Sequence, residues 1–532
     1  MLWVLGIAAA VLFFYYFLYK PQLYWKEKNV SQGPPVPILG DNWKNVLGQE
    51  AMMEMLKRIY NRHKNDRYAG FYQTTMPSLM IRDPELIKQI TIKDFDHFVD
   101  HRLFAPENVE PIWTKNLFSL KGDTWRDMRA TLSPTFTASK MRSMFVLMEK
   151  SGQQYVDFYL KQNKNVIELE LKDSFTRFAN DVIANCAFGV KVDSLKEPEN
   201  EFYMKGKAAT NFSGFVKQMK FLLSMMSPKL SACLGLSIFE SNVTQFFQSL
   251  IHDTVKMREE QNIIRPDMIN LLMEARKGRL HYEESTEKQD AGFATVEESD
   301  IGKVGVNQKL AMTESDMAAQ VLIFFFAGFE TISTMMSFMC YELALHPEIQ
   351  EKLHQEIDLT YKNNNGKLTY DVLNKMKYMD MVISESMRKN PAAVMTDRIC
   401  TKAYTIQPEL PHETPLKVNV GDLIIIPVVG IHNDEKLYPN PDKFDPERFS
   451  DENKDLIKPY TYLPFGVGPR NCIGSRFALM ECKTLIFHIL SNFELTVIEK
   501  TTVPMKISKK SLNPAIEGGC WVGFKRRENL VR

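Results

Sequence analysis

The sequence predicts a mainly α-helical protein with a minor β part, and three observations support this fold class. Five segments repeat apolar residues at three- and four-residue spacing, as helices with one buried face do: 50–64, 137–162, 240–276, 314–346 and 371–390. Two short stretches, near 70–82 and 423–429, are instead rich in β-forming residues. The 532 residues are enough for several domains or for one unusually large one. The sequence shows no internal repeat.

The N-terminus is expected to be a membrane anchor over residues 1–20. Leu2 to Leu18 carries no charge and is just long enough to cross the hydrocarbon core as a helix. Lys20, Lys26 and Lys28 follow it, so the positive-inside rule places the rest of the chain in the cytosol. A cleaved signal sequence or a buried core helix is the alternative.

The region after the anchor is expected to be a linker, residues 21–40, with a proline-rich hinge. Gly33-Pro34-Pro35-Val36-Pro37 is stiff and extended because proline fixes φ and disfavours helix before it. Residues 41–532 are taken as one folded domain. Within it, the polar and charged stretch 277–316 is expected to be a long surface loop.

Composition excludes several classes of protein. The formal net charge of +1 provides no global field for nucleic acid. The seven cysteines are scattered and odd in number, and no CxxC pair occurs, which argues against a disulfide framework and a structural zinc site. We therefore expect reduced thiols.

The segment Pro464–Gly474 carries the strongest chemical signal. Its glycines and prolines forbid a regular helix and allow the backbone to approach a flat ligand closely. Cys472 precedes an apolar helical stretch at 475–490, and a thiol at a helix N-terminus is expected to have a lowered pKa. A thiolate that binds haem iron donates electrons and favours O–O cleavage. The alternative is a structural cysteine buried in a glycine-rich turn.

These residues carry a family resemblance. Phe465, Gly468, Arg470, Cys472 and Gly474 match the haem loop of cytochrome P-450 enzymes at all five fixed positions. The sequence resembles this family over essentially its whole length, and most closely the insect xenobiotic-metabolising members of the animal microsomal type. The resemblance implies a helical bundle around haem b with small β-sheets, preceded by a transmembrane helix, and Cys472 as the axial ligand to the iron.

A second motif is Glu385-x-x-Arg388, which places both charges on one helix face. Isolated pairs of this kind are usually solvated and contribute little. The resemblance implies instead that Glu385, Arg388 and Arg448 form a buried charge network that supports the haem loop.

A third motif, Ala327-Gly328-Phe329-Glu330-Thr331, lies within a long apolar helix. By resemblance, the helix makes room for dioxygen here, Thr331 is the oxygen-activating hydroxyl, and Glu330 is the acidic proton source. Plain helix packing is the alternative.

Further cofactor contacts follow from the resemblance. Trp125 and Arg129 share one helix face and are expected at a haem propionate, together with Arg398. Relatives often carry another propionate-binding arginine where this chain has His101, so the choice between His101 and Arg102 stays open. Surface arginines are the alternative reading.

The resemblance implies a monooxygenase that inserts one oxygen atom of O2 into substrate, with electrons from NADPH. No GxGxxG or flavin motif is present, so these electrons must arrive through a separate flavoprotein reductase with FAD and FMN, or through cytochrome b5. The docking surface is expected at a basic face of Arg126, Lys140, Arg142, Arg476 and Lys483. The expected location is the endoplasmic reticulum membrane, single-pass, facing the cytosol. The rivals are a haem-thiolate isomerase or dehydratase and a non-catalytic haem-binding sensor.

The substrate is expected to be lipophilic, such as an insecticide or plant toxin. The candidate pocket residues are almost all apolar and suit a broad hydrophobic site. They are Phe104, Trp113, Phe118, Phe212, Phe215, Phe221, Met225, Met226, Phe239, Phe246, Phe247, Phe324, Phe325, Phe326, Phe329 and 392–395. The alternative for each residue is the ordinary core.

Overall fold

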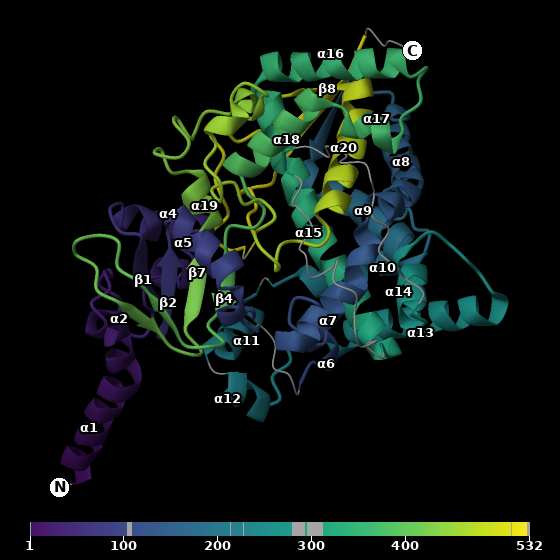
Figure 1. Ribbon diagram of the computed structural model, residues 1–532. Coiled ribbons are helices and arrows are strands. Elements are labelled where there is room, and N and C mark those ends of the chain that lie inside the picture. Colours follow the sequence, from purple (N-terminus) through teal and green to yellow (C-terminus); the bar gives the residue numbers. More distant parts are fainter. Residues whose placement is uncertain are drawn as a thin grey trace.

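The computed structural model describes residues 2–103, 109–212, 214–226, 228–278, 293–294, 312–511 and 513–528. Figure 1 shows a large helical body, a small sheet at one side of it, and helix α1 projecting away from that same side. The predicted fold class, mainly α with a minor β part, is confirmed. The long helices are α4 (Met52–Arg62), α7 (Gly122–Leu132), α8 (Ala138–Leu160), α9 (Leu171–Ile183), α10 (Glu201–Thr210), α11 (Phe215–Met226), α13 (Ser241–Gln261), α14 (Met268–Arg276), α15 (Glu314–Leu345), α16 (Pro347–Asn363), α18 (Lys377–Lys389) and α20 (Ser475–Asn492).

Shorter helices connect or extend these elements. They are α2 (Tyr24–Glu27), α3 (Trp43–Val46), α5 (Pro84–Lys88), α6 (Pro111–Thr114), α12 (Pro228–Cys233), α17 (Tyr370–Asn374) and α19 (Val428–His432), besides the N-terminal α1 (Leu2–Phe13). Two of the five predicted helical segments are divided. The segment 240–276 ends its first helix at Asn262, which is left-handed at φ 52°, and starts the second after Asp267, whose carboxylate accepts from the Asn270 N–H.

The β part forms three small sheets. The largest has the order β1-β2-β7-β4, with β1 (Tyr68–Gln73) and β2 (Met76–Ile81) as an antiparallel hairpin and β7 (Leu423–Ile426) parallel to β2. The stretches predicted near 70–82 and 423–429 therefore contain strands, and β7 is fully buried because it lies between two neighbours. The remaining strands are β3 (Val166–Glu170), β4 (Thr396–Ile399), β5 (Tyr404–Ile406), β6 (Leu416–Val418), β8 (Phe493–Thr496) and β9 (Trp521–Arg526).

Helix α15 runs through the middle of the helical body (Figure 1) and packs against α9, α18, α13, α10 and α20. Its start is fixed by a capping box in which Thr313 and Asp316 each accept from the other's backbone N–H. It is long and apolar enough to cross a membrane, yet most of it is buried inside the protein. The central position explains that composition, because a helix surrounded by other helices is apolar on most faces.

The N-terminal span, Trp3–Glu27, is the other candidate membrane crossing, and its apolar window is not buried in the body. The chain after it is packed: Trp25 is fully buried, and its ring lies so close to Gly70 that a Cβ there would clash. The Tyr24 hydroxyl donates to Asp422 at 2.7 Å. Part of the expected linker 21–40 thus lies against the small sheet, so the apolar N-terminal helix leaves the body from a fixed position.

Candidate functional site

The loop before α20 holds Cys472 in a tight turn. The Cys472 N–H donates to the Phe465 carbonyl at 2.8 Å, and the Asn471 N–H donates to the Gly468 carbonyl at 2.9 Å. Gly468 has φ +73°, and a Cβ there would lie 2.1 Å from the Thr91 carbonyl oxygen. Only glycine fits this position, because any side chain would clash with backbone as well as strain φ. Gly468 therefore lets the loop backbone pack directly against the backbone at Thr91.

Cys472 is accessible to solvent, although it lies deep among protein atoms, so its sulfur faces an internal space. Burial raises the pKa of the Cys472 thiol, while the Gly474 N–H and the Arg129 charge act in the opposite direction. The prediction of a lowered pKa from the helix N-terminus is therefore wrong for the protein without a metal. Desolvation outweighs the Gly474 N–H and the Arg129 charge here, whereas a metal cation on the sulfur would favour the thiolate.

A second accessible surface lies on the central helix α15. Ala327 and Thr331 are exposed, one turn apart, whereas Phe325, Phe329 and Ile332 beside them are buried. The Thr331 hydroxyl donates to the Ala327 carbonyl at 2.5 Å. An exposed stripe on a helix that is enclosed by other helices faces an interior space, as Cys472 does. The predicted threonine is thus accessible inside the body.

Glu330, the predicted proton source, has a partner that the sequence did not reveal. Lys172, on α9, lies 2.9 Å from the Glu330 Oε2 atom and also donates to the hydroxyls of Ser333 and Thr334. Burial lowers the pKa of Lys172, and Glu330 counteracts that effect. Glu330 therefore points toward α9, while Thr331 lies on the accessible stripe. Lys172 is far away in the chain and belongs to no motif, so no spacing could have found it.

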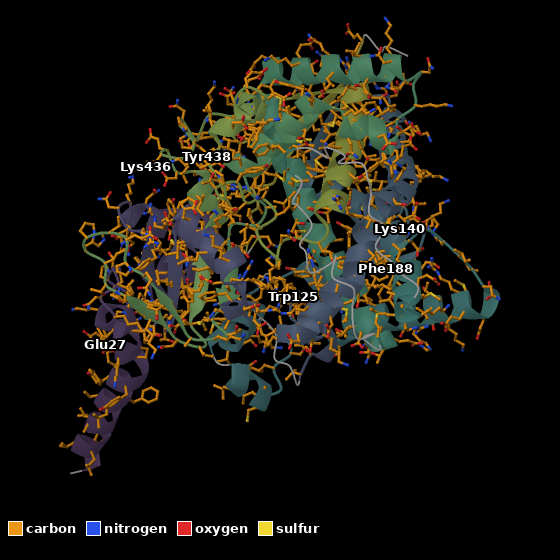
Figure 2. All side chains as sticks on the ribbon, in the orientation of Figure 1. Glu27, Trp125, Lys140, Phe188, Lys436 and Tyr438 are labelled. Carbon is orange, nitrogen blue, oxygen red and sulfur yellow. The ribbon has the colours of Figure 1, made fainter. Side chains whose placement is uncertain are left out.

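Arg129 reaches the cysteine loop directly. Its guanidinium donates to the Asn471 carbonyl at 2.9 Å and to the Asn471 side-chain oxygen at 2.7 Å. Trp125, one turn earlier on α7, is fully buried in the middle of the body (Figure 2). The Arg470 guanidinium lies 4.0 Å above the Trp125 ring. The structure therefore brings the predicted Trp125, Arg129 and Arg470 together around the loop.

Arg470 and Arg398 are fixed mainly by backbone carbonyls. Arg470 donates to the carbonyls of Val99 and Leu120 at 2.8 and 2.6 Å, and Arg398 donates to the Val467 carbonyl at 3.2 Å. The Asp100 carboxylate lies 3.7 Å from Arg470, and Asp397 acts on both Arg398 and Arg470, so two carboxylates offset part of the positive charge that the neutral carbonyls leave. Both arginines therefore remain cationic groups inside the protein.

His101 and Arg102 lie differently. The His101 Nδ1 atom is 3.0 Å from the Asp397 carboxylate, and its ring stacks on Phe118 at 4.5 Å. The Arg102 backbone N–H also donates to Asp397, but its guanidinium donates to the Gln73 side chain at the end of β1. His101 thus shares the Asp397 environment with Arg398, while the Arg102 side chain is directed to the β1–β2 hairpin.

The residues at this site fit an anionic cofactor. Burial, first of all, lowers the pKa of Arg129 and Arg398 to about 10 and that of Arg470 to about 9, and Arg398 and Arg129 repel Arg470 further. The Nε atoms of Arg129 and Arg398 are buried and have no hydrogen-bond partner among the described residues. Asp100 and Asp397 are the two carboxylates that act on Arg470 and Arg398, and they compensate only part of the charge of the three arginines, which is costly unless a further anion lies between them. The two carboxylates of haem, beside a cysteine that faces the same interior, would supply that charge.

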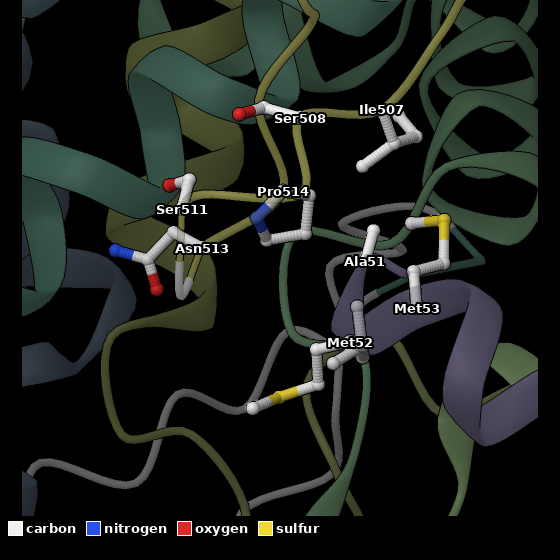
Figure 3. Close-up of a pocket in the computed structure, with 9 residues that line it drawn as sticks. Ala51, Met52, Met53, Ile507, Ser508, Ser511, Asn513 and Pro514 are labelled. Carbon is white, nitrogen blue, oxygen red and sulfur yellow. The ribbon is translucent and has the colours of Figure 1, made fainter. Parts of the chain in front are cut away.

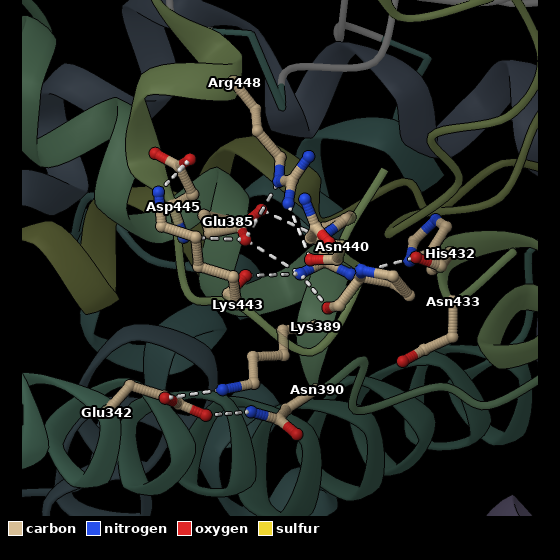
Figure 4. Close-up of polar contacts among 12 residues, drawn as sticks. Glu342, Glu385, Lys389, Asn390, His432, Asn433, Asn440, Lys443, Asp445 and Arg448 are labelled. Atoms are coloured by element: carbon tan, nitrogen blue, oxygen red, sulfur yellow. Dashed lines mark hydrogen bonds and ion pairs between the residues drawn. The ribbon is translucent and has the colours of Figure 1, made fainter. Parts of the chain in front are cut away.

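The predicted charge network is present and buried (Figure 4). Arg388 binds Glu385 through two parallel hydrogen bonds of 2.9 and 2.8 Å, and both side chains have 0% exposure. The Arg448 Nε atom lies 3.5 Å from the same carboxylate, and the Asp445 N–H donates to it. The surface alternative for this pair is therefore excluded.

His432 links this network to the cysteine loop, and sequence reasoning missed it. Arg388 donates to the His432 carbonyl at 3.0 Å, and the Leu463 N–H donates to the His432 Nε2 atom at 2.8 Å. Leu463 directly precedes the Pro464–Gly474 loop. A single histidine at the end of the short helix α19 gives no signal in the sequence, so only the contact identifies it.

His432 predicts a loss of stability in mild acid. Burial, together with the nearby Arg388, lowers the pKa of His432 to about 3. The unfolded chain binds this proton at a pKa of about 6.5 and the folded protein does not, so stability is complete above that value and falls as pH decreases toward 3. The expected cost is about 2 kcal/mol at pH 5.

Thermal unfolding between pH 8 and pH 5 checks this expectation with His432→Gln, which should show a shallower pH dependence than the native chain. His412→Gln is the control, because the His412 side chain is largely exposed. An identical pH dependence in His432→Gln and the native chain would contradict the assignment.

The predicted basic face needs one correction. Lys483 is fully buried in α20 and lies 3.2 Å from the Asp380 carboxylate, so it cannot contribute to a surface. It is buried because α20 is enclosed by other helices, a tertiary effect that the charge pattern does not report. Arg142 is exposed and pairs with Asp371 at 2.7 Å.

The aromatic residues predicted for the substrate pocket separate into two groups. Phe325 packs in the core against Phe188, Phe202 and Phe247. The other group surrounds Trp113, which stacks on Phe239 at 3.5 Å and meets Phe326 edge-on, with Phe212 against both phenylalanines. Phe104 and the side chains of Phe215, Met225 and Met226 lie outside the described residues.

A small pocket lies between the start of α4 and the chain near residue 510 (Figure 3). Met52, Met53, Val394, Ile507 and Pro514 contribute to its lining, and the pocket is partly open to solvent. It is therefore far from an enclosed site for a small molecule, which typically measures roughly 300–1,000 Å³. Val394, one of the predicted substrate residues, therefore opens onto a minor cavity.

Comparison with known proteins agrees with this geometry. The family model described as Cytochrome P450 matches residues 31–518. This chain belongs to the cytochrome P450 family. It is 46% identical to "Cytochrome P450 9e2" of Blattella germanica over 99% of this chain and 98% of the relative. It is 41% identical to "Probable cytochrome P450 9f2" of Drosophila melanogaster, over 99% and 100% of the two chains. The cytochrome P450 is thus an oxidoreductase of the haem-thiolate monooxygenase class.

Proposed function

We propose that this cytochrome P450 is a membrane-anchored enzyme that inserts one oxygen atom of O2 into lipophilic xenobiotics. The observation that carries the proposal is the cysteine loop beside three buried, undercompensated guanidinium groups. Arg129 joins the two features, since it binds Asn471 next to Cys472. Haem needs both a thiolate that binds its iron and a group of cations that binds its two carboxylates. The presence of both at one place therefore indicates haem more specifically than either feature does alone.

The residues have distinct roles in this proposal. Bound haem would supply the redox chemistry and the site of oxygen activation. Cys472 binds the iron, Phe465 and Arg470 shape the loop around the sulfur, and Trp125 orients Arg470 by stacking. Arg129, Arg398 and His101 are assigned to the propionates. His101 is preferred over Arg102 because the Arg102 guanidinium is engaged by Gln73.

Thr331 is proposed to hold a proton-relaying water at its Oγ1 atom, which lies on the accessible stripe of α15. Glu330 is proposed as the acid that supplies protons to that water; because its carboxylate is paired with Lys172 at 2.9 Å and directed toward α9, this transfer requires the pair to open and the carboxylate to take up a proton from solvent first. A hydroxyl and an acid in this arrangement deliver protons one at a time, as oxygen activation requires.

Replacement of Thr331 by alanine should leave cofactor binding unchanged and reduce coupling. Without the hydroxyl, the relay loses its last hydrogen-bonding group, and general acid–base groups contribute ~10²–10⁴ to the rate of the step they serve, so product formed per NADPH should fall by a factor of about 10 or more as uncoupled pathways take over. The measurement is product and peroxide per NADPH consumed. Ser337→Ala is the control, because that buried hydroxyl on the same helix donates to the Ser333 carbonyl. Unchanged product per NADPH in Thr331→Ala would refute the role.

A hydrophobic substrate is proposed because the described residues around Trp113 are aromatic. Phe212, Phe239 and Phe326 surround it with ring centroids between 3.5 and 6.5 Å apart. Trp113 and Phe239 are buried in the core and Phe212 and Phe326 are half-buried against it, so a substrate that reached this cluster would meet aromatic carbon and few polar anchors. Spectral titration with compounds of graded hydrophobicity should show tighter binding of the more apolar ones. Tight binding confined to a single polar molecule would contradict this part of the proposal.

The proposed partners and location follow from the anchor and the redox chemistry. Electrons come from NADPH through a flavoprotein reductase, with cytochrome b5 as a second donor. The exposed N-terminal helix supports an endoplasmic reticulum anchor with the enzyme facing the cytosol, because Lys20, Lys26 and Lys28 follow the apolar span.

A further inference from the structure

Segment 115–120, between α6 and α7, is hydrogen-bonded to the central helix through Gln320. This glutamine lies on α15 and has no exposed surface. Its side-chain oxygen accepts from the Leu117 N–H at 2.7 Å, and its side-chain nitrogen donates to the Lys115 carbonyl at 2.9 Å. The Lys115 side chain also pairs with Asp316 at 3.9 Å, but the lysine is half-exposed, so this ion pair contributes little. The buried amide therefore holds the segment at a set distance from α15.

The same segment is also bound to the cysteine loop. Arg470 donates to three of its carbonyls, those of Leu117, Phe118 and Leu120, at 3.1, 3.3 and 2.6 Å. The Leu117 peptide groups are thus held from two directions, because the N–H binds the side chain from α15 and the carbonyl binds the guanidinium of the cysteine loop. Segment 115–120 therefore forms a bridge between α15 and the cysteine loop.

Phe118 is an exposed aromatic side chain within this bridge. It is 39% exposed, whereas Leu117 and Ser119 on either side of it are buried. Its ring is stacked on the buried His101 ring, with the two centroids 4.5 Å apart. Because the proposed function assigns His101 to a propionate, the Phe118 ring would lie beside the cofactor, on the wall of the substrate space.

Gln320 lies on the same helix face as the predicted oxygen-activating threonine. Positions 320, 324, 327 and 331 follow one another at three- and four-residue spacing, which places their side chains along one face of α15. Exposure increases along this face: Gln320 is buried, Phe324 is half-buried, and Ala327 and Thr331 are exposed. Gln320 thus closes one end of the accessible stripe, about 10 Å along the helix axis from Ala327.

We propose that Gln320 is a positioning residue that sets the width of the substrate space between Phe118 and the accessible stripe of α15. The inference rests on the proposed function, because it concerns the substrate site of that reaction. A bulky ligand can push segment 115–120 away from α15 only by breaking both hydrogen bonds to Gln320, whereas a small ligand leaves them intact. Ligand size is therefore selected by the free energy of these bonds. Without them, Arg470 still holds the segment to the cysteine loop, so the space widens while the cofactor site is kept.

The test compares the binding of a small and a bulky azole, imidazole and clotrimazole, to the haem-loaded, full-length chain in spectral titrations. Both bind haem iron through an imidazole nitrogen, so the ratio of their dissociation constants measures the space around the cofactor. Gln320→Met removes both hydrogen bonds and keeps an unbranched side chain of similar length. We expect it to lower the clotrimazole-to-imidazole ratio at least about threefold, because the bulky ligand no longer has to break these bonds.

Gln350→Met is the matched control, because Gln350 is also a buried amide that binds backbone groups. It accepts from the Leu495 N–H at 2.6 Å and donates to the Leu495 carbonyl at 3.0 Å, between α16 and β8. Its loss should leave the ratio unchanged. Gln320→Glu is a second variant, which should also lower the ratio because a carboxylate cannot donate to the Lys115 carbonyl.

An unchanged ratio in either folded Gln320 variant, or an equal fall in Gln350→Met, would overturn the inference. If the native chain binds neither azole, the inference fails together with the proposed haem site. If the ratio falls as expected but no NADPH-dependent oxygenation occurs, the inference holds and the proposed reaction fails. Hydrogen exchange provides a check that does not depend on haem, since the Leu117 amide should be protected in the native chain and should exchange faster in Gln320→Met.

Discussion

Replacement of Cys472 by histidine should abolish the red-shifted absorption band of the reduced, CO-bound protein. The band depends on a thiolate ligand, which Cys472 would provide to bound haem, and an imidazole would be a weaker electron donor to the iron. The fold should survive, because the loop is fixed by backbone hydrogen bonds, such as that from the Cys472 N–H to Phe465, which do not involve the sulfur. Oxygen insertion should fall to the background level.

Cys233→Ser is the matched control for this experiment. Cys233 is the other exposed cysteine, it lies on the short helix α12, and its loss should leave the band intact. The remaining five cysteines are buried. Persistence of the full band in Cys472→His would show that another residue binds the iron.

Replacement of Glu385 by glutamine should destabilise the protein by about 3–5 kcal/mol. The substitution leaves Arg388 fully buried without its counter-charge, and it also removes the charge that Arg448 faces at 3.5 Å. Arg388 would still donate to the carbonyls of His432 and Pro441, but neutral carbonyls do not replace a carboxylate. Thermal inactivation and haem retention measure the effect.

Glu447→Gln provides the comparison, since it makes the same chemical change in the adjacent 3-10 helix Pro446–Phe449. Glu447 pairs with Lys352 in solvent, where such pairs contribute about 1 kcal/mol or less. A Glu385→Gln variant as stable as Glu447→Gln would mean that the buried network does not support the fold.

Local patterns predicted most of the helical architecture. The apolar periodicity of 314–346 corresponds to α15, and that of 137–162 to α8, within two residues at either end. The division of segment 240–276 into two helices could not be seen from its apolar periodicity. Asn262 ends the first helix in a left-handed conformation and Asp267 caps the second, and neither residue changes the period of the pattern. The cysteine loop was recognisable because its residue types are set locally. Gly468 is needed for a backbone turn with positive φ, and Cys472 is needed as a metal-binding thiol.

Features that depend on distant contacts could not be predicted. Lys172 and His432 become important only when α9 meets α15 and when α19 meets the cysteine loop. The pKa of Cys472 was misjudged for the same reason, since a helix N-terminus is a local effect and burial is a tertiary one. Lys483 appeared among the surface cations because its sequence neighbours do not show that α20 is enclosed.

The central claim is that this chain inserts an atom of dioxygen into an apolar substrate. The most direct measurement is mass spectrometry of the product formed under ¹⁸O2 with NADPH and the flavoprotein reductase. We expect one ¹⁸O atom per product molecule and none from labelled water. A rearranged or dehydrated product without label, formed in the absence of NADPH, would contradict it and favour the isomerase or dehydratase alternative.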